Sequence, residues 1–167
     1  MTTSTGQIQK MAQNIREQII KDRRFLHEIP EIGTDLPETS AYIKKRLDEM
    51  GIAWKDCGGP LPAAMTEDYI AAGFPRMEKE TGVVATIGRG SPCFLLRADI
   101  DALPVREDND LDFKSTNGFG HMCGHDAHAA MLLGAAQILK ELEEQIPGTV
   151  KLMFQPGEET GAGARLM

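Results

Sequence analysis

Three histidines, one aspartate and one cysteine lie within the eight-residue stretch HMCGHDAH, residues 121–128. The whole chain has only four histidines and three cysteines. Thiolate and imidazole groups are ligands that zinc and similar transition metals prefer. Cys123 and His125 are two residues apart, so they can face one ion from a loop or an extended backbone but not from one face of a helix. The stretch predicts a metal site; an inert buried thiol beside hydrogen-bonded histidines is the alternative.

Two adjacent carboxylates, Glu158 and Glu159, follow the apolar stretch TVKLMF at 149–154. Adjacent residues in an extended segment point in opposite directions, so one carboxylate can bind a metal while the other transfers protons. The alternative is a solvated acidic turn after a strand. The apolar strand leading directly into the pair favours the functional interpretation.

Asp99 and Asp101 lie two residues apart within an apolar run, and therefore on the same side of a strand. An unpaired carboxylate in such surroundings is costly, so each aspartate needs a partner. One candidate is a salt bridge to Arg97 or Arg106. The other is a metal-bound histidine that the carboxylate orients.

The elements that must position these groups can be predicted from periodicity and from Gly and Pro positions. Apolar residues at helical spacing predict one helix from Ile8 to Leu26, which ends before Pro30. A second helix is expected from Pro37 to Met50, with Gly51 as its C-cap. Further predicted elements are a strand at 52–57, a short helix at 63–73 within an excursion over 57–81, strands at 82–88 and 93–103, a helix at 126–145 and a strand at 149–154.

The order of these elements predicts an α/β fold, a mixed β-sheet flanked by helices. The strands at 82–88 and 93–103 are separated only by RGSP, which favours a hairpin whose strands are buried on both faces. Asp126 is the expected N-cap of the helix that follows. Since sites in such sheets gather beyond the carboxyl ends of strands, the three polar groups are expected to converge there.

Composition narrows the classes of function. The chain of 167 residues is long enough for one domain. It has 18 Lys and Arg against 25 Asp and Glu, a net charge of −7 without a basic stripe, so we expect no nucleic-acid partner. No apolar stretch suits a secretory signal or a membrane span. Three cysteines without a CxxC pair do not form a disulfide framework. We expect a cytoplasmic protein with no membrane partner.

Three motifs in order, RADIDALP, HMCGHDAH and FQPGEE, give the chain a resemblance to the metal-dependent amidohydrolases of peptidase family M20. Within that family it is most similar to the N-acyl-amino-acid and auxin-conjugate hydrolases, the aminoacylase-like subfamily. The stretch RRFLHEIPEIG at 23–33 resembles the usual opening of these proteins. The similarity covers nearly the whole chain except the excursion at 57–81.

The resemblance implies a role for five residues. Cys123, His125 and Glu159 would be metal ligands. Glu158 would be the general base that activates water, and Asp101 the supporting catalytic aspartate. Asp99 stands where many relatives place a ligating histidine. The implied reaction is hydrolysis of the amide bond of an N-acyl amino acid or small peptide, with divalent metal, two ions per complete site, as zinc, manganese or cobalt.

The resemblance also implies that residues 1–167 are the N-terminal part of the catalytic domain, without the lid or dimerisation domain and the C-terminal part that follow in relatives. Missing strands would expose an apolar sheet edge, which favours a homo-oligomer. Two other functions stay open. One is a catalytically inactive fragment that acts as an interaction or regulatory module, and the weaker one is a cysteine-dependent hydrolase using Cys123 with His125.

Overall fold

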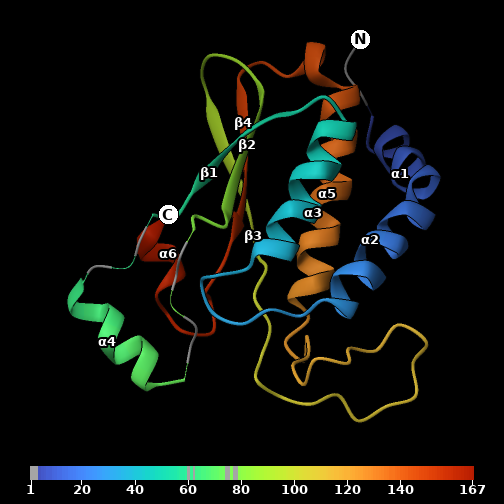
Figure 1. The fold of residues 1–167 in the computed structure, drawn as a ribbon. Coiled ribbons are helices and arrows are strands. Elements are labelled where there is room, and N and C mark those ends of the chain that lie inside the picture. The colour runs from blue at the N-terminus through green and yellow to red at the C-terminus, as the bar shows by residue number, and fades with distance from the viewer. Residues whose placement is uncertain (1–3, 60, 62, 74–75, 77–78) are drawn as a thin grey trace.

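The structure, a computed structural model, describes residues 4–59, 61, 63–73, 76 and 79–167. A mixed four-stranded sheet with helices on both sides forms the fold, as the sequence predicts (Figure 1). In chain order the elements are α1 Thr5–Asn14, α2 Arg16–Glu28, α3 Pro37–Glu49, β1 Ala53–Cys57, α4 Ala63–Ala71, β2 Gly82–Gly88, β3 Cys93–Asp99, α5 His125–Glu141, the 3₁₀ turn η1 Glu143–Gln145, β4 Thr149–Gln155 and α6 Gly163–Leu166.

The sheet has the strand order β1-β2-β4-β3. β2 is antiparallel to both β1 and β4, whereas β3 is parallel to β4. The predicted hairpin of β2 and β3 is therefore wrong, because β4 lies between them. The segment β3–α5–β4 is a β–α–β crossover that returns the chain beside β3. The parallel pairing aligns Asp99 with Gln155, so β3 and β4 end at the same edge of the sheet.

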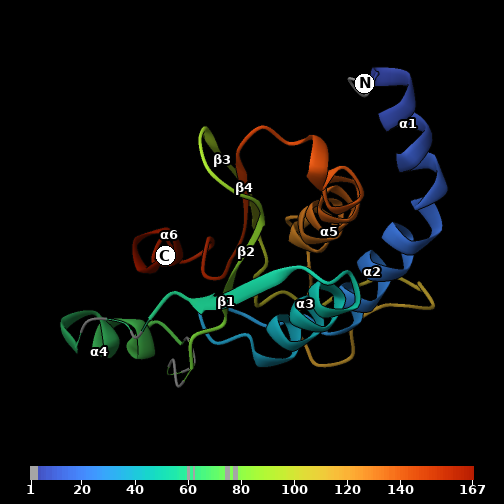
Figure 2. The ribbon, with the colours of Figure 1, turned by 90° about the horizontal axis from the view of Figure 1, so that it is seen from above.

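The core lies between the sheet and helices α3 and α5, which cover one face, while α4 and α6 lie on the other side (Figure 2). Phe154, Leu152 and Leu133 are fully buried in this core. β2 is buried along most of its length. β3 departs from the prediction of burial on both faces, since it is the edge strand of the described sheet: Phe94 is 64% and Leu95 53% exposed.

Several helix predictions are confirmed. Helix α3 begins at Pro37, and Gly51 beyond its end has a φ of 65°. Helix α4 lies within the predicted excursion, in which residues 60, 62, 74, 75, 77 and 78 lie outside the described residues. Within the described part of the chain, no helix combines the length and apolar character needed to cross a membrane.

Two helix predictions need correction. The expected helix from Ile8 to Leu26 is divided into α1 and α2 at Ile15, whose ψ of 3° is not helical. Ile15 is buried there and lies near Gly134 of α5, so packing against α5 accompanies the break. Asp126 is not the N-cap of α5: Gly124 holds that position and accepts the backbone N–H groups of the first turn, while Asp126 lies within that turn.

Candidate metal centre

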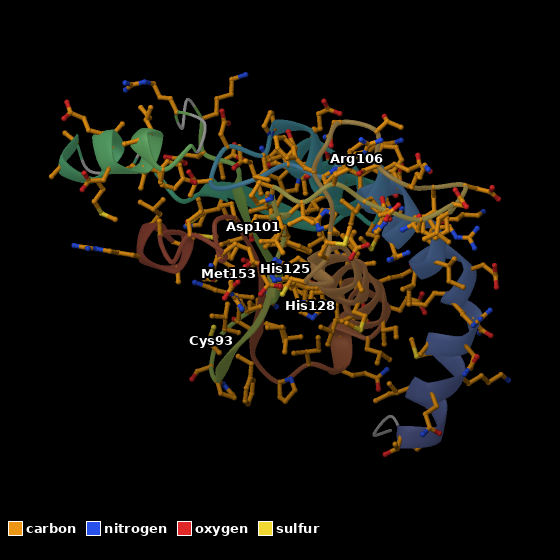
Figure 3. The ribbon with its side chains drawn as sticks, turned by 90° about the horizontal axis from the view of Figure 1, so that it is seen from below. Cys93, Asp101, Arg106, His125, His128 and Met153 are labelled. Atoms are coloured by element: carbon orange, nitrogen blue, oxygen red, sulfur yellow. The ribbon has the colours of Figure 1, made fainter. Side chains whose placement is uncertain are left out.

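The carboxyl ends of β3 and β4 bring three loops to one place. Asp99 ends β3, and β4 runs on towards Glu158 and Glu159. Helix α5 begins at the same edge with His125. Figure 3 shows Asp101, His125 and His128 grouped together. The predicted convergence of the three polar groups is thus present in the fold.

Two glycines permit the loops that carry these groups. Gly124, directly before α5, has a φ of 84°, a left-handed conformation that favours glycine. Gly157, in the turn after β4, has a φ of 66°, and a Cβ there would lie 2.5 Å from Cγ2 of Thr34. Glu158 and Glu159 consequently lie in a turn, not in the extended segment that the sequence predicted.

His125 is the centre of the group, with a side chain only 2% exposed. Its Nδ1 lies 2.9 Å from the backbone oxygen of Asp101, and because a carbonyl can only accept, Nδ1 carries the proton. The lone pair of Nε2 is then free to bind a cation. Nε2 lies 3.7 Å from oxygens of Asp99 and Glu159 and 3.8 Å from one of Glu158.

Cys123, His125 and Glu159 fit a divalent cation. One ligand atom from each lies within 4.8 Å of the others. Two ligands bound to zinc at about 2.0–2.3 Å with tetrahedral angles are about 3.5 Å apart, close to the 3.7 Å between His125 and Glu159. Oε1 of Glu159 is buried and has no hydrogen-bond partner among the described residues. A cation would supply the partner that this costly buried oxygen lacks.

Asp101 joins two of these residues. Its carboxylate Oδ2 accepts the backbone N–H of Glu159 at 3.1 Å, and Oδ1 lies 3.3 Å from Nδ1 of His125. The Asp101 side chain is completely buried. It therefore fixes the ring of His125 and the turn that carries Glu159 relative to each other, as residues behind metal ligands commonly do.

Asp99 has the partner that sequence reasoning left open. Its Oδ2 forms a 3.0 Å ion pair with Arg97, one of the predicted partners, and its Oδ1 lies 2.6 Å from Nδ1 of His128. Arg106, the other candidate, lies well apart from the group (Figure 3). Asp99, His125 and His128 form a second group whose ligand atoms lie within 4.8 Å. Because both oxygens of Asp99 already have partners, this second group suits a cation less than the first.

The carboxylates also change the acidity of their neighbours. Burial alone would lower the pKa of His125, but hydrogen bonding to Asp101 and the charge of Asp99 raise it. Contact with Glu159, together with some burial, raises the pKa of the Cys123 thiol. Burial would raise the pKa of Asp99, yet the hydrogen bond from His128 and nearby positive charge lower it. An excess of negative charge thus surrounds His125 and attracts a cation.

Sequence reasoning missed the pairing of Asp99 with His128, since no periodicity links residues so far apart in the chain. It also left His121 open, with a hydrogen-bonded histidine as one alternative. His121 is buried, and neither ring nitrogen has a hydrogen-bond partner in the described part of the chain. Burial lowers its pKa to about 4, which keeps the ring neutral at neutral pH.

The sequence matches known proteins along most of its length. It is 46% identical over 145 residues to the IAA-amino acid hydrolase ILR1-like 5 of Arabidopsis thaliana, a match that covers 86% of this chain and 29% of the relative. It is 43% identical over 153 residues to the N-acetyl-L-cysteine deacetylase of Bacillus subtilis, a match that covers 90% of this chain and 32% of the relative. The chain therefore spans about a third of the length of these relatives.

Solved structures match the fold as well. The Bacillus subtilis YXEP protein, described as a dinuclear metal binding peptidase from the M20 family, superposes with a TM-score of 0.75 at 36% identity, over 92% of this chain and 38% of that one. A putative aminohydrolase from methicillin resistant Staphylococcus aureus superposes with a TM-score of 0.78 at 30% identity, over 94% of this chain and 36% of that one. Residues 95–167 match the sequence model of peptidase family M20/M25/M40. Together these matches show that the chain belongs to the M20/M25/M40 peptidase family.

Proposed function

We propose that this chain supplies part of a metal-dependent amidohydrolase site that cleaves the amide bond of N-acyl amino acids or small peptides. The observation that carries the proposal is the convergence of Cys123, His125 and Glu159, from two separate loops, within ligand distance of one another. The names of the relatives support the substrate class, since they refer to an IAA-amino acid and to N-acetyl-L-cysteine.

The geometry supports the role proposed for each residue. A divalent cation lowers the pKa of water from about 15.7 towards about 7 and polarises an amide carbonyl. Cys123, His125 and Glu159 would hold such a cation, and Asp101 would fix the last two. Glu158, whose side chain is 42% exposed beside Nε2 of His125, accepts a proton from the attacking water and passes it to the leaving amine.

Zinc, manganese and cobalt all suit this mixture of sulfur, nitrogen and oxygen ligands. A complete site would hold two ions, which the description of the YXEP protein as dinuclear supports. We propose that residues 1–167 are the first part of the catalytic domain. We also propose a cytoplasmic location, which the three free cysteines support because disulfides are rare there.

Metal content tests the proposal directly. After dialysis, the purified chain is expected to retain divalent cation by elemental analysis, and a chelator should remove it. Release of amine from N-acetyl and N-benzoyl amino acids should depend on the cation, in this chain or in a longer protein that contains it. A chain that binds no divalent cation contradicts the proposal, and one that binds metal without hydrolysis supports the alternative of an interaction or regulatory module.

The cysteine-dependent hydrolase is a weaker alternative. A nucleophilic cysteine needs a lowered pKa, whereas the neighbouring carboxylates raise the pKa of Cys123. Thiol alkylation separates the two mechanisms: bound cation should protect Cys123 and chelator should expose it. Hydrolysis that survives the chelator but not the alkylating reagent would favour the cysteine mechanism.

The exposed edge strand β3 is proposed to pair with a second copy of the chain. Phe94, Leu95 and Leu96 are 64%, 53% and 40% exposed and form an apolar run beside unpaired backbone groups, the kind of edge that associates. Light scattering at high concentration should give more than the monomeric mass. Phe94→Lys with Leu96→Lys should restore the monomer, and a wild-type chain that stays monomeric would refute the pairing.

A further inference from the structure

The motif RRFLHEIPEIG at 23–33 has no role in the site described so far, yet it contacts the loop that carries Cys123. This loop, residues 100–124, connects β3 to α5 and is called the 100–124 loop below. The backbone oxygen of Glu31 accepts the N–H of Ala102 at 2.7 Å, and that of Pro30 accepts Nδ2 of Asn117 at 2.8 Å. The motif therefore contacts both the first and the second half of the 100–124 loop.

His27 is a buried contact between the two segments. Its side chain is 5% exposed, and each ring nitrogen faces a carboxylate. Nδ1 lies 2.7 Å from Oδ2 of Asp126, in the first turn of α5, and Nε2 lies 2.6 Å from Oε1 of Glu107, in the 100–124 loop. One ring thus connects three segments: α2, the loop and α5.

Both carboxylates are surrounded by other donors. Asp126 accepts Nε of Arg23 at 2.9 Å and the backbone N–H of Ala127 at 2.8 Å. Glu107 accepts Nδ2 of Asn109 and the backbone N–H of Ser115, both at 2.7 Å. Apart from the ring of His27, every contact named here for these oxygens is with a donor, which favours the ionised form of both carboxylates.

An ionised carboxylate only accepts hydrogen bonds, so each ring nitrogen of His27 that faces one is placed to donate. The cluster thus sets two basic side chains, His27 and Arg23, against two acidic ones, Asp126 and Glu107. Burial alone would raise the pKa of Glu107. Hydrogen bonds, of which that with His27 has the largest effect, lower this pKa to about 2. Such charge-assisted hydrogen bonds are about twice as strong as neutral ones.

We propose that His27 is a positioning residue whose ring, hydrogen-bonded at both nitrogens, ties the 100–124 loop to the first turn of α5, and so holds Cys123 and His125 opposite Glu159. The inference rests on the proposed function for its consequence at the metal site, but the tie itself involves only residues of this chain. Cys123 lies near the end of the tied loop and His125 directly precedes Asp126, so release at either carboxylate should move a proposed ligand.

His27→Gln tests the tie, because its single amide reaches only one carboxylate. Hydrogen exchange followed by mass spectrometry should show the loop amides, including that of Ser115, exchanging roughly 10- to 100-fold faster, the ratio that the loss of one charge-assisted hydrogen bond gives. Amides of β2 and β4 should keep the wild-type rate. Adding Glu107→Gln to this variant should recover much of the protection, since two amides can pair across the same gap.

Two controls make the result decisive. Leu26→Ala removes a fully buried neighbour on the same helix and should speed exchange throughout the core without selecting the loop. Glu28→Gln changes an exposed neighbour and should leave exchange unchanged. Wild-type loop exchange in His27→Gln, or the uniform pattern of Leu26→Ala, would overturn the inference. If His27→Gln does not fold, Glu107→Gln alone must speed exchange in the loop, and its failure to do so would also overturn it.

Cobalt titration supplies the second measurement. The near-ultraviolet charge-transfer absorption of a cobalt–thiolate bond reports Cys123 as a ligand, and His27→Gln should weaken both the absorption and the affinity. If the cobalt titration of His27→Gln matches that of the wild type, the consequence for the metal site is overturned. A wild-type chain without this absorption refutes the proposed function instead, and the exchange experiment still decides whether His27 ties the loop.

Discussion

The Glu158→Gln variant is expected to lose about 10²- to 10⁴-fold in the rate of amide hydrolysis, the range that a positioned general base contributes. Glutamine keeps the shape of the side chain but cannot accept the proton of the attacking water. Turnover of N-acetyl and N-benzoyl amino acids should be measured in this chain and in any longer protein that contains it. Cobalt or zinc affinity should change little, because Glu158 is not one of the three grouped ligands.

Glu144→Gln is the matched control, since Glu144 is an exposed glutamate in η1 and the chemical change is the same. It should have wild-type activity. Undiminished hydrolysis by Glu158→Gln would remove this residue from the mechanism while leaving the metal site intact. A large loss of metal affinity would instead make Glu158 a ligand.

Replacing Cys123 by alanine is expected to weaken the binding of a divalent cation by more than about 100-fold. Loss of a residue that only hydrogen-bonds to a metal ligand typically weakens binding by roughly 10- to 100-fold, and loss of a ligand itself should cost more. The variant removes the sulfur, one of three grouped ligand atoms, and leaves the nitrogen and the carboxylate. Isothermal titration with zinc measures the affinity. Cobalt binding should also lose its thiolate charge-transfer absorption.

The chain contains its own control for this experiment, Cys93→Ala. Cys93 is another exposed free cysteine, but it begins β3, the strand that ends at the metal site, and it lies apart from His125 (Figure 3). Its removal should leave affinity and absorption unchanged. Equal effects of the two substitutions would show that thiols bind metal nonspecifically, and an unchanged Cys123→Ala would take the sulfur out of the ligand set.

Local patterns in the sequence predicted most of the elements but not their pairing. Pro37 and Gly51 marked the ends of α3, and the apolar runs of β2 and β4 are strands. The short RGSP connection suggested a hairpin because it is a local signal. The position of β4 between β2 and β3 depends on a crossover through α5, and such long-range pairing leaves no trace in neighbouring residues.

For the candidate site, the sequence predicted which groups lie near one another better than it predicted their hydrogen-bond partners. The proximity of Cys123, His125 and Glu159 follows from the rule that strand ends gather functional groups. The rule says nothing about which polar groups pair behind them. Asp126 illustrates the limit: its type and place favoured an N-cap, but Arg23 and His27 of α2 are the partners of its carboxylate.

The β–α–β arrangement of β3, α5 and β4 has a consequence for how the protein is made. The side chains grouped around His125 lie between Asp99 and Glu159, and so within the β3–α5–β4 unit and the turn that directly follows it. During translation these donors are therefore all outside the ribosome once residue 159 has emerged, before any later residue has left the exit tunnel. If these donors bind a cation as proposed, the nascent chain would acquire it early, and the ion would order this unit while the chain is still being made.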